Sequence, residues 1–147
     1  MAGINLRAPN IVSICVDSIE GREMNGRLSH RYSADPIVFL GISSLLSRME
    51  HFFDMIRFPQ ASMETRTFLK KDSSARRQDD NELVQVLSVD DLSSLRGEKA
   101  TFIVHVQYRQ NATWQGNIYW IERDVTRTFR SALEFLKLLD STIDEIN

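Results

Sequence analysis

Residues 113–145 carry two apolar patterns in succession, and this succession constrains the fold more than any other feature. Between positions 114 and 121 the side chains alternate, so Trp114, Ile118 and Trp120 would share one face of a strand. A helix is predicted to follow this strand, and neither the apolar face of the strand nor that of the helix can remain in water, so we expect the two to pack against each other. The helix is predicted by apolar residues at spacings of three and four: Phe129, Ala132, Leu133, Leu136, Leu139 and Ile143.

The composition is that of one small soluble domain. The chain has 147 residues, of which 42% are hydrophobic and 26% are charged, a balance that supports a single core. No apolar run approaches the roughly 18 residues that span a bilayer, and the N-terminus lacks the layout of a secretory signal. Cys15 is the only cysteine, which excludes an internal disulfide and a cysteine zinc site. We therefore expect a cytoplasmic protein that does not associate with membranes.

The N-terminal part opens with a similar pattern. Residues 11–18 alternate between apolar and polar side chains, which predicts a half-buried strand. Turn residues follow, and a second strand is expected at 27–32. Asp35 is a suitable N-cap and Pro36 a suitable first helical residue, so we expect a helix over residues 35–57.

This first predicted helix carries more apolar surface than one sheet face covers. Two interpretations fit the excess: the helix is buried on two sides within the chain, or its extra face is the interface of a homodimer. The candidate oligomer interface consists of the residues that broaden the apolar stripe: Ile37, Phe39, Leu40 and Leu46.

Between residues 58 and 99 the patterns weaken. Residues 70–81 hold almost no apolar side chain and are expected to form a mobile loop. Residues 100–110 alternate clearly again and predict a strand. The other elements indicated in this part are short: strands at 63–69 and 83–87, and a helical turn at 90–95.

An internal repeat is indicated by the sequence. Laying residues 11–56 over residues 101–146 requires no gap. The apolar strand positions then coincide, Gly26 falls on Gly116, and the apolar positions of the two predicted helices share one register. Two unrelated segments would match in strand period, turn and helix register only sometimes, so the coincidence favours a duplication.

The predicted fold class is α+β, built from a duplicated ββα unit within a single domain. The repeats would span 11–57 and 100–147 and be joined by residues 58–99. Facing each other through a pseudo-twofold axis, they would form one antiparallel sheet or two half-sheets. Two long amphipathic helices and a mobile central loop complete this prediction.

Two resemblances to known families accompany these patterns. The run TWQG, followed by a tryptophan and then by FRSALEFLKLLDS, resembles a C-terminal signature of a set of small uncharacterised bacterial proteins, which implies no activity. The last helix is also similar to the repeat of the PUR and Whirly single-strand nucleic-acid-binding proteins, which use duplicated sheet-plus-helix units and often dimerise. This chain departs from them in having two predicted strands, not four, before its first helix, and no basic surplus. The residues that carry the second resemblance are Phe129, Arg130, Ala132, Leu133, Leu138, Leu139 and Asp140.

No pattern of catalytic or metal-binding residues stands out in the sequence. His30, His51 and His105 are too scattered for a metal site local in sequence, and His105 has no histidine or carboxylate close by at ligand spacing. Cys15 lies on a predicted strand without a histidine nearby to act as a base. Glycine-rich phosphate loops and a nucleophile elbow are also missing from the sequence. We therefore expect no enzymatic activity, no metal and no cofactor.

The polar face of the predicted strands is the candidate ligand-binding surface. An aromatic ring offers a surface on which a base can stack, and arginine, glutamine and asparagine offer hydrogen-bond donors and acceptors. A plain solvated outer face of an antiparallel sheet would have the same composition. The candidate residues are Arg27, Arg31, His105, Gln107, Arg109, Gln115, Asn117 and Tyr119.

Two functions remain open at this point. The first is a non-enzymatic protein-interaction or regulatory module that forms a homodimer and binds a protein partner the sequence does not name. The second is a binder of single-stranded nucleic acid or of a nucleotide on the outer face of the strands. The net charge of −2 favours the first function, because binding to a phosphate backbone requires a basic surplus.

Overall fold

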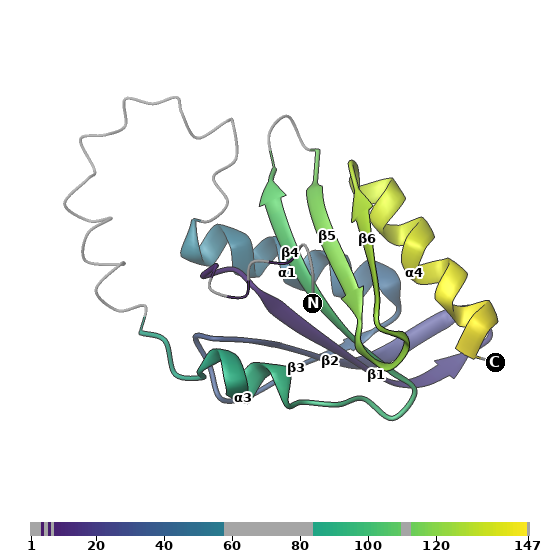
Figure 1. The fold of residues 1–147 in the computed structure, drawn as a ribbon, viewed down its shortest axis with the longest axis horizontal. Helices are drawn as coiled ribbons and strands as arrows, with labels where there is room; N and C mark the ends of the chain where they lie inside the picture. Colours follow the sequence, from purple (N-terminus) through teal and green to yellow (C-terminus); the bar gives the residue numbers. More distant parts are fainter. Residues whose placement is uncertain (1–3, 5, 7, 58–83, 110–112, 147) are drawn as a thin grey trace.

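The computed structural model describes residues 4, 6, 8–57, 84–109 and 113–146. They form an α+β fold with a six-stranded antiparallel sheet in the order β3-β2-β1-β4-β5-β6 (Figure 1). None of the helices in these ranges has the length and apolar content needed to cross a bilayer. In chain order the elements are β1 (Val12–Glu20), β2 (Glu23–His30), β3 (Ile37–Leu40), α1 (Ile42–Ile56), α3 (Val89–Ser93), β4 (Ala100–Tyr108), β5 (Gln115–Trp120), η4 (Ile121–Arg123), β6 (Val125–Phe129) and α4 (Ala132–Ile146).

The long helices α1 and α4 cover one face of the sheet and enclose the main core (Figure 1). From α1 the core receives Leu45, Met49 and Phe53, and α4 contributes the corresponding stripe of its own apolar side chains. The predicted inward faces of three strands are confirmed, because their residues are all buried in this core: Val12, Ile14 and Val16 of β1; Phe102, Val104 and Val106 of β4; and Trp114, Ile118 and Trp120 in and before β5.

A second, smaller core lies on the opposite face of the sheet. There α3 and the N-terminal segment cover the central strands, and Ile4 and Leu92 pack with Ile103 and Tyr119. Over β3 the same face stays open, since alternate residues of that strand are exposed. Within the described residues the two sides of the sheet are therefore unequal: helices α1 and α4 lie on one side, and α3 and the N-terminal segment cover the centre of the other.

The first helix begins later than predicted. Residues 37–40 form the strand β3, and α1 starts at Ile42 after Gly41, whose φ of 91° suits a glycine. A short apolar run such as residues 37–40 fits a buried strand as well as part of a buried helix, and periodicity alone does not distinguish the two. Pairing with β2 decides for the strand, because Phe39 lies opposite Gly26 and enters the main core.

The last helix also follows a third strand. Thr126 and Thr128, both of residue types that often cap helices, lie in β6. Two hydrogen bonds cap the start of α4: Glu134 N–H donates to Ser131 Oγ at 3.0 Å, and the Glu134 carboxylate accepts from the N–H of Arg130, one residue before Ser131, at 2.8 Å. Each half of the chain thus has three strands before its helix, where the sequence predicted two.

The segment between the two halves agrees only in part with its prediction. The helical turn expected at 90–95 is present as α3. A strand was expected at 83–87, but residues 84–87, which the structure describes, do not form one. The N–H groups of Val86 and Leu87 both donate to the carbonyl of Arg31 and not to a neighbouring strand. The strand and the mobile loop expected within 63–81 lie outside the described residues.

The two halves follow one order of elements at an offset of 90 residues. The helices α1 and α4 each have 15 residues and begin at positions 42 and 132. A β-bulge follows Val16 in β1, where the facing strand has Gly26, and another follows Val106 in β4, where the facing strand has Gly116. Strand order, helix length and bulge position therefore coincide between the halves.

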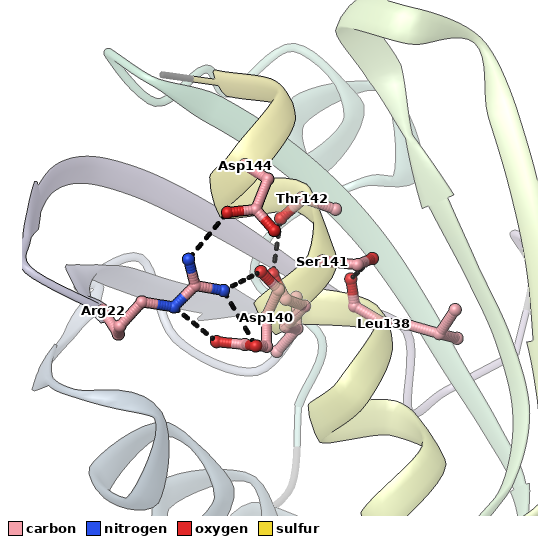
Figure 2. Close-up of polar contacts among 7 residues, drawn as sticks. Arg22, Leu138, Asp140, Ser141, Thr142 and Asp144 are labelled. Atoms are coloured by element: carbon pink, nitrogen blue, oxygen red, sulfur yellow. Dashed lines mark hydrogen bonds and ion pairs between the residues drawn. The ribbon is translucent and has the colours of Figure 1, made fainter.

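Arg22, in the turn between β1 and β2, clasps helix α4 of the other half (Figure 2). Its Nη1 donates to the Asp144 carboxylate at 2.7 Å, and its Nη2 lies 2.9 Å from the Asp140 carboxylate and 3.0 Å from the Asp140 carbonyl. The Arg22 side chain is 52% exposed, so solvent screens these ion pairs. This contact ties the hairpin of one half to the helix of the other at the protein surface.

Arg109, directly after β4, makes the corresponding contact with helix α1. Its Nη1 lies 3.0 Å from the Glu50 carboxylate and 2.9 Å from the Asp54 carboxylate. The guanidinium also sits over the ring of Phe53, 5.4 Å from the ring centroid. The two acidic residues stand 90 positions before those that Arg22 contacts. Unlike Arg22, the Arg109 side chain is only 3% exposed, whereas Glu50 and Asp54 are 42% and 67% exposed, so in this second contact the cation is buried and the two carboxylates are not.

His30 makes the stability of the core depend on pH. Its ring stacks on Phe52 with the centroids 4.0 Å apart, and its Nδ1 accepts the N–H of Tyr32 at 3.1 Å. Burial lowers the pKa of His30 from its ordinary value of 6.5 to about 4. Because the folded state holds this ring neutral, its contribution to stability is complete above the ordinary pKa and is lost as the pH falls toward the lowered one.

We expect the free energy of unfolding to be lower at about pH 5 than at about pH 7 by about 1 to 2 kcal/mol because of His30. Urea titrations at the two pH values measure this difference. In His30→Phe the stacking on Phe52 is kept and the titration is removed, so the pH dependence should shrink. An undiminished pH dependence in this variant would assign the effect to other groups, such as His105, whose pKa is also lowered by burial.

Candidate interaction surface

The residues predicted to bind a ligand do not form one surface. His105 is 6% exposed and Tyr119 is 9% exposed, because the N-terminal segment and α3 cover the centre of the outer face. The Tyr119 hydroxyl also lies 2.7 Å from the Asp124 carboxylate, to which it donates. In contrast to the prediction, Tyr119 does not present an open ring on which a base could stack.

Arg109 lies on the face opposite to the predicted one. Strict alternation along β4 would turn Tyr108 inward and Arg109 outward. The bulge after Val106 shifts this alternation, so Tyr108 is 55% exposed and Arg109 turns toward helix α1. An alternating pattern cannot reveal a bulge; the only signal in the sequence is Gly116 on the facing strand.

Arg27 and Arg31 are engaged within the chain. Arg27 makes two hydrogen bonds to the Asp17 carboxylate, at 2.8 and 3.1 Å, and these bonds hold the pKa of Asp17 below its usual value. Arg31 Nε donates to the carbonyl of Leu87 at 3.1 Å. The two arginines therefore fasten β2 to β1 and to the segment before α3.

The three predicted amide residues lie toward the C-terminal half of the sheet. Gln107 and Gln115 are exposed, whereas Asn117 is half-buried and its Oδ1 accepts from the Thr128 hydroxyl at 3.0 Å. They offer hydrogen bonds to solvent or a ligand. With Tyr119 buried and the arginines engaged elsewhere, this patch has the composition of an ordinary solvated sheet face.

The residues of the predicted oligomer interface also separate. Phe39 is fully buried in the main core, and Ile37 and Leu46 pack half-buried against that core. Leu40, however, is 72% exposed. Val38, two residues earlier on the same strand, is 60% exposed. Of the predicted interface residues, the exposed one, Leu40, therefore lies on an edge strand and not on a helix.

Strand β3 also exposes backbone hydrogen-bonding groups. It stands first in the strand order, so β2 is its neighbour on one side and no described strand lies on the other. Gly41 N–H donates to the Met24 carbonyl at 2.9 Å, which fixes the phase of the antiparallel hydrogen bonds. By that alternation, the N–H and C=O groups of Val38 and Leu40 point away from β2. We call these two residues, with their outward backbone groups, the β3 edge.

Two hollows on the surface flank the β3 edge. Their volumes are about 470 and about 420 Å³. One hollow lies near each end of β3, and both include residues of β2, the strand on the paired side of β3. The first is lined by Leu40, Gly41 and Glu23, and the second by Pro36, Arg27 and Leu95 among others.

The described residues hold neither a cluster of metal ligands nor an exposed thiol. Among them, no three histidine, cysteine, aspartate or glutamate side chains come together in a way that could hold a metal ion. Cys15 is fully buried, and burial raises the pKa of its thiol, which disfavours the reactive thiolate.

No family model, no curated protein and no solved structure matches this chain. A function is therefore inferred from the geometry and chemistry of its own surfaces.

Proposed function

We propose that this chain is a non-enzymatic protein-interaction module that binds a partner by adding a strand of that partner to the β3 edge. One observation supports this most directly: Val38 and Leu40 leave 60% and 72% of their surfaces exposed on an edge strand. Natural sheets usually protect such edges with charged residues, bulges or covering loops, because an apolar edge invites pairing. Residues 37–40 contain no charge, so the β3 edge has the character of a binding surface.

Strand addition explains why backbone and side chains are exposed at the same residues. In this mode of recognition, main-chain hydrogen bonds supply affinity and pockets for alternate side chains supply specificity. Val38 and Leu40 provide both the outward main-chain groups and the exposed apolar side chains. A partner of this module is accordingly an extended protein segment.

Binding of single-stranded nucleic acid receives less support. The net charge is −2, Tyr119 is 9% exposed, and Arg27 is paired with Asp17. A nucleic-acid site on the outer strand face would need an exposed aromatic ring on which bases can stack and cationic groups that can contact the phosphates. The open part of the outer face has exposed amides, apolar side chains and the 55% exposed Tyr108, but its predicted arginines are engaged within the chain.

The proposed module has an internal duplication as its scaffold, with βββα in place of the expected ββα as the repeated unit. Matching helices, matching bulges and the offset of 90 residues support this duplication. At the centre of the sheet, Ser13 of β1 lies opposite Ile103 of β4. Ile103 is also the residue that matches Ser13 in the repeat, because it stands 90 positions later. A pseudo-twofold axis through this pair would relate the halves. A cytoplasmic setting is part of the proposal, and the free, buried Cys15 suits a reducing compartment.

Selection of random peptides displayed on phage tests the proposed function. We expect peptides with alternating apolar residues to bind the wild-type chain and to lose binding to the double variant Val38→Lys, Leu40→Lys. Thr128→Lys is the matched control, because Thr128 lies on the opposite edge strand, 90 positions after Val38, and should leave binding unchanged. Peptides that bind the double variant as well as the wild type would contradict the assignment of the β3 edge.

A further inference from the structure

We propose that the partner strand is β3 of a second copy of this chain, paired antiparallel about a twofold axis at Phe39. This inference rests on the proposed function, because it names the occupant of the β3 edge. The sheets of the two copies would join into one continuous sheet through their β3 strands. Because such an axis stands perpendicular to the sheet, helices α1 and α4 of both copies would lie on the same face.

The backbone of the β3 edge is complementary to itself. Its outward N–H and C=O groups belong to Val38 and Leu40, which stand on either side of Phe39. An axis at Phe39 sets Val38 of each copy opposite Leu40 of the other, and both residues then exchange N–H···O bonds as an antiparallel pair does. All outward groups of these two residues are satisfied in this arrangement.

Neighbouring registers satisfy fewer of these groups. A shift by one residue would set the outward groups of Val38 against the inward-facing groups of Phe39. A shift by two residues in one direction would set Leu40 opposite Pro36, which has no N–H to donate. The register centred on Phe39 therefore uses the exposed backbone most completely.

The same register brings the exposed side chains together. Val38 and Leu40 lie on the outer face, where they are cross-strand neighbours of Arg27 and Asn25 of β2. Across the axis, Val38 of one copy would lie beside Leu40 of the other, so that four side chains now 60% and 72% exposed would cover one another. Residues 37–40 carry no charge, so pairing sets no like charges opposite each other.

A second copy meets the requirements of this edge better than an arbitrary strand. A twofold interface needs one patch that is its own complement, and the β3 edge fulfils this in hydrogen-bonding groups, apolar character and charge. Pairing of two short strands buries less surface than a standard stable interface. We therefore expect a reversible dimer with a dissociation constant on the order of 10 µM.

Sedimentation of the full chain over concentrations from about 1 to 500 µM tests this proposal. The mass of the wild type should rise from the 17.0 kDa of one chain toward twice that value. Val38→Pro removes an outward N–H that β2 does not use, and Val38→Lys keeps the backbone intact while adding a charge. Both variants should remain monomeric with an unchanged circular dichroism spectrum. Thr128→Pro, at the corresponding position of β6, is the matched control and should still dimerise.

Cysteine cross-linking tests the register. The natural Cys15 is fully buried and does not compete. Under mild oxidation, a mixture of Val38→Cys and Leu40→Cys chains should form a disulfide-linked dimer, because these positions face each other across the axis. Either variant alone should cross-link at least tenfold less, since identical residues stand two positions out of register. Efficient cross-linking of Val38→Cys with itself would overturn the register centred on Phe39.

Two further outcomes would overturn self-pairing. A wild-type chain that stays monomeric at the highest concentration has no β3–β3 dimer, and a dimer that survives both Val38→Pro and Val38→Lys is held together elsewhere. The proposed function fails separately. If phage-selected peptides still require Val38 and Leu40 while the chain is monomeric, the β3 edge binds a foreign strand. If those peptides do not require Val38 and Leu40, the assignment of the β3 edge falls as well.

Discussion

Gly26→Ala and Gly116→Ala are each expected to lower the free energy of unfolding by about 3 to 4 kcal/mol. A Cβ atom at Gly26 would overlap the carbonyl oxygen of Cys15, and one at Gly116 would overlap the carbonyl oxygen of His105. Each obstacle is the backbone of a neighbouring strand at a bulge, so it cannot move aside as a flexible side chain can. Urea or thermal denaturation of the two variants measures the loss.

Gly21→Ala is the control for this prediction. Gly21 has a φ of 65°, but a Cβ atom there meets no atom within 4 Å. The cost of this change is therefore the conformational strain of a left-handed residue alone, about 1 kcal/mol. If Gly26→Ala and Gly116→Ala cost no more than Gly21→Ala, the bulges would be able to relax, and close packing of the backbones would not be the reason for glycine at these positions.

The double variant Glu50→Gln, Asp54→Asn is expected to lower the free energy of unfolding by about 2 to 3 kcal/mol. Arg109 is 3% exposed, and these changes remove two of the carboxylates that face its guanidinium. A buried cation that loses its counter-ions keeps its cost of desolvation, and this cost destabilises the fold. Glutamine at position 50 keeps an oxygen that can accept from Trp114 Nε1, so that contact is preserved. Chemical denaturation measures the change.

Arg109→Met separates this cause from a general loss of packing. Added to the double variant, methionine places an apolar chain over Phe53 and leaves the amides at positions 50 and 54 to water, since Glu50 and Asp54 are 42% and 67% exposed. We expect the triple variant with Arg109→Met to be more stable than the double variant. If methionine does not restore stability, the uncompensated charge of Arg109 is not the source of the loss.

The exposed clasp at Arg22 provides a matched comparison. Asp140→Asn with Asp144→Asn removes the corresponding two carboxylates, but Arg22 is 52% exposed and remains hydrated. The loss of stability should be clearly smaller than that caused by the changes at Glu50 and Asp54. Equal losses at the two clasps would show that burial does not decide their energetic weight.

The central strands were predictable from the sequence because a period of two records which face is buried. Val12, Ile14 and Val16 alternate with polar neighbours, and all three enter the main core. The strand and helix in the last third of the chain were predictable for the same reason. The third strand of each half was not, because the run from Ile37 to Leu40 satisfies a helical stripe as well as a strand, and only pairing with β2 distinguishes them.

The candidate site was less predictable than the fold. Alternation placed Arg109 outward, but the bulge after Val106 turned it toward helix α1. Alternation also placed Tyr119 on the outer face correctly, yet it carried no information on the N-terminal residues that cover it. A strand pattern reports the face of its own side chains, while the exposure of that face depends on segments distant in the sequence.

By itself the sequence determined an α+β chain with two strand-to-helix segments, whose apolar periods had to pack together because neither can remain in water. Only the tertiary structure decided that Phe39 is core while its neighbours Val38 and Leu40 form an exposed sheet edge. The physical reason is that a strand forms an edge when no other strand pairs with one of its two sides. The residues of the strand itself do not determine this. Local pattern specifies how a strand alternates, and its place in the sheet follows only when all strands have paired.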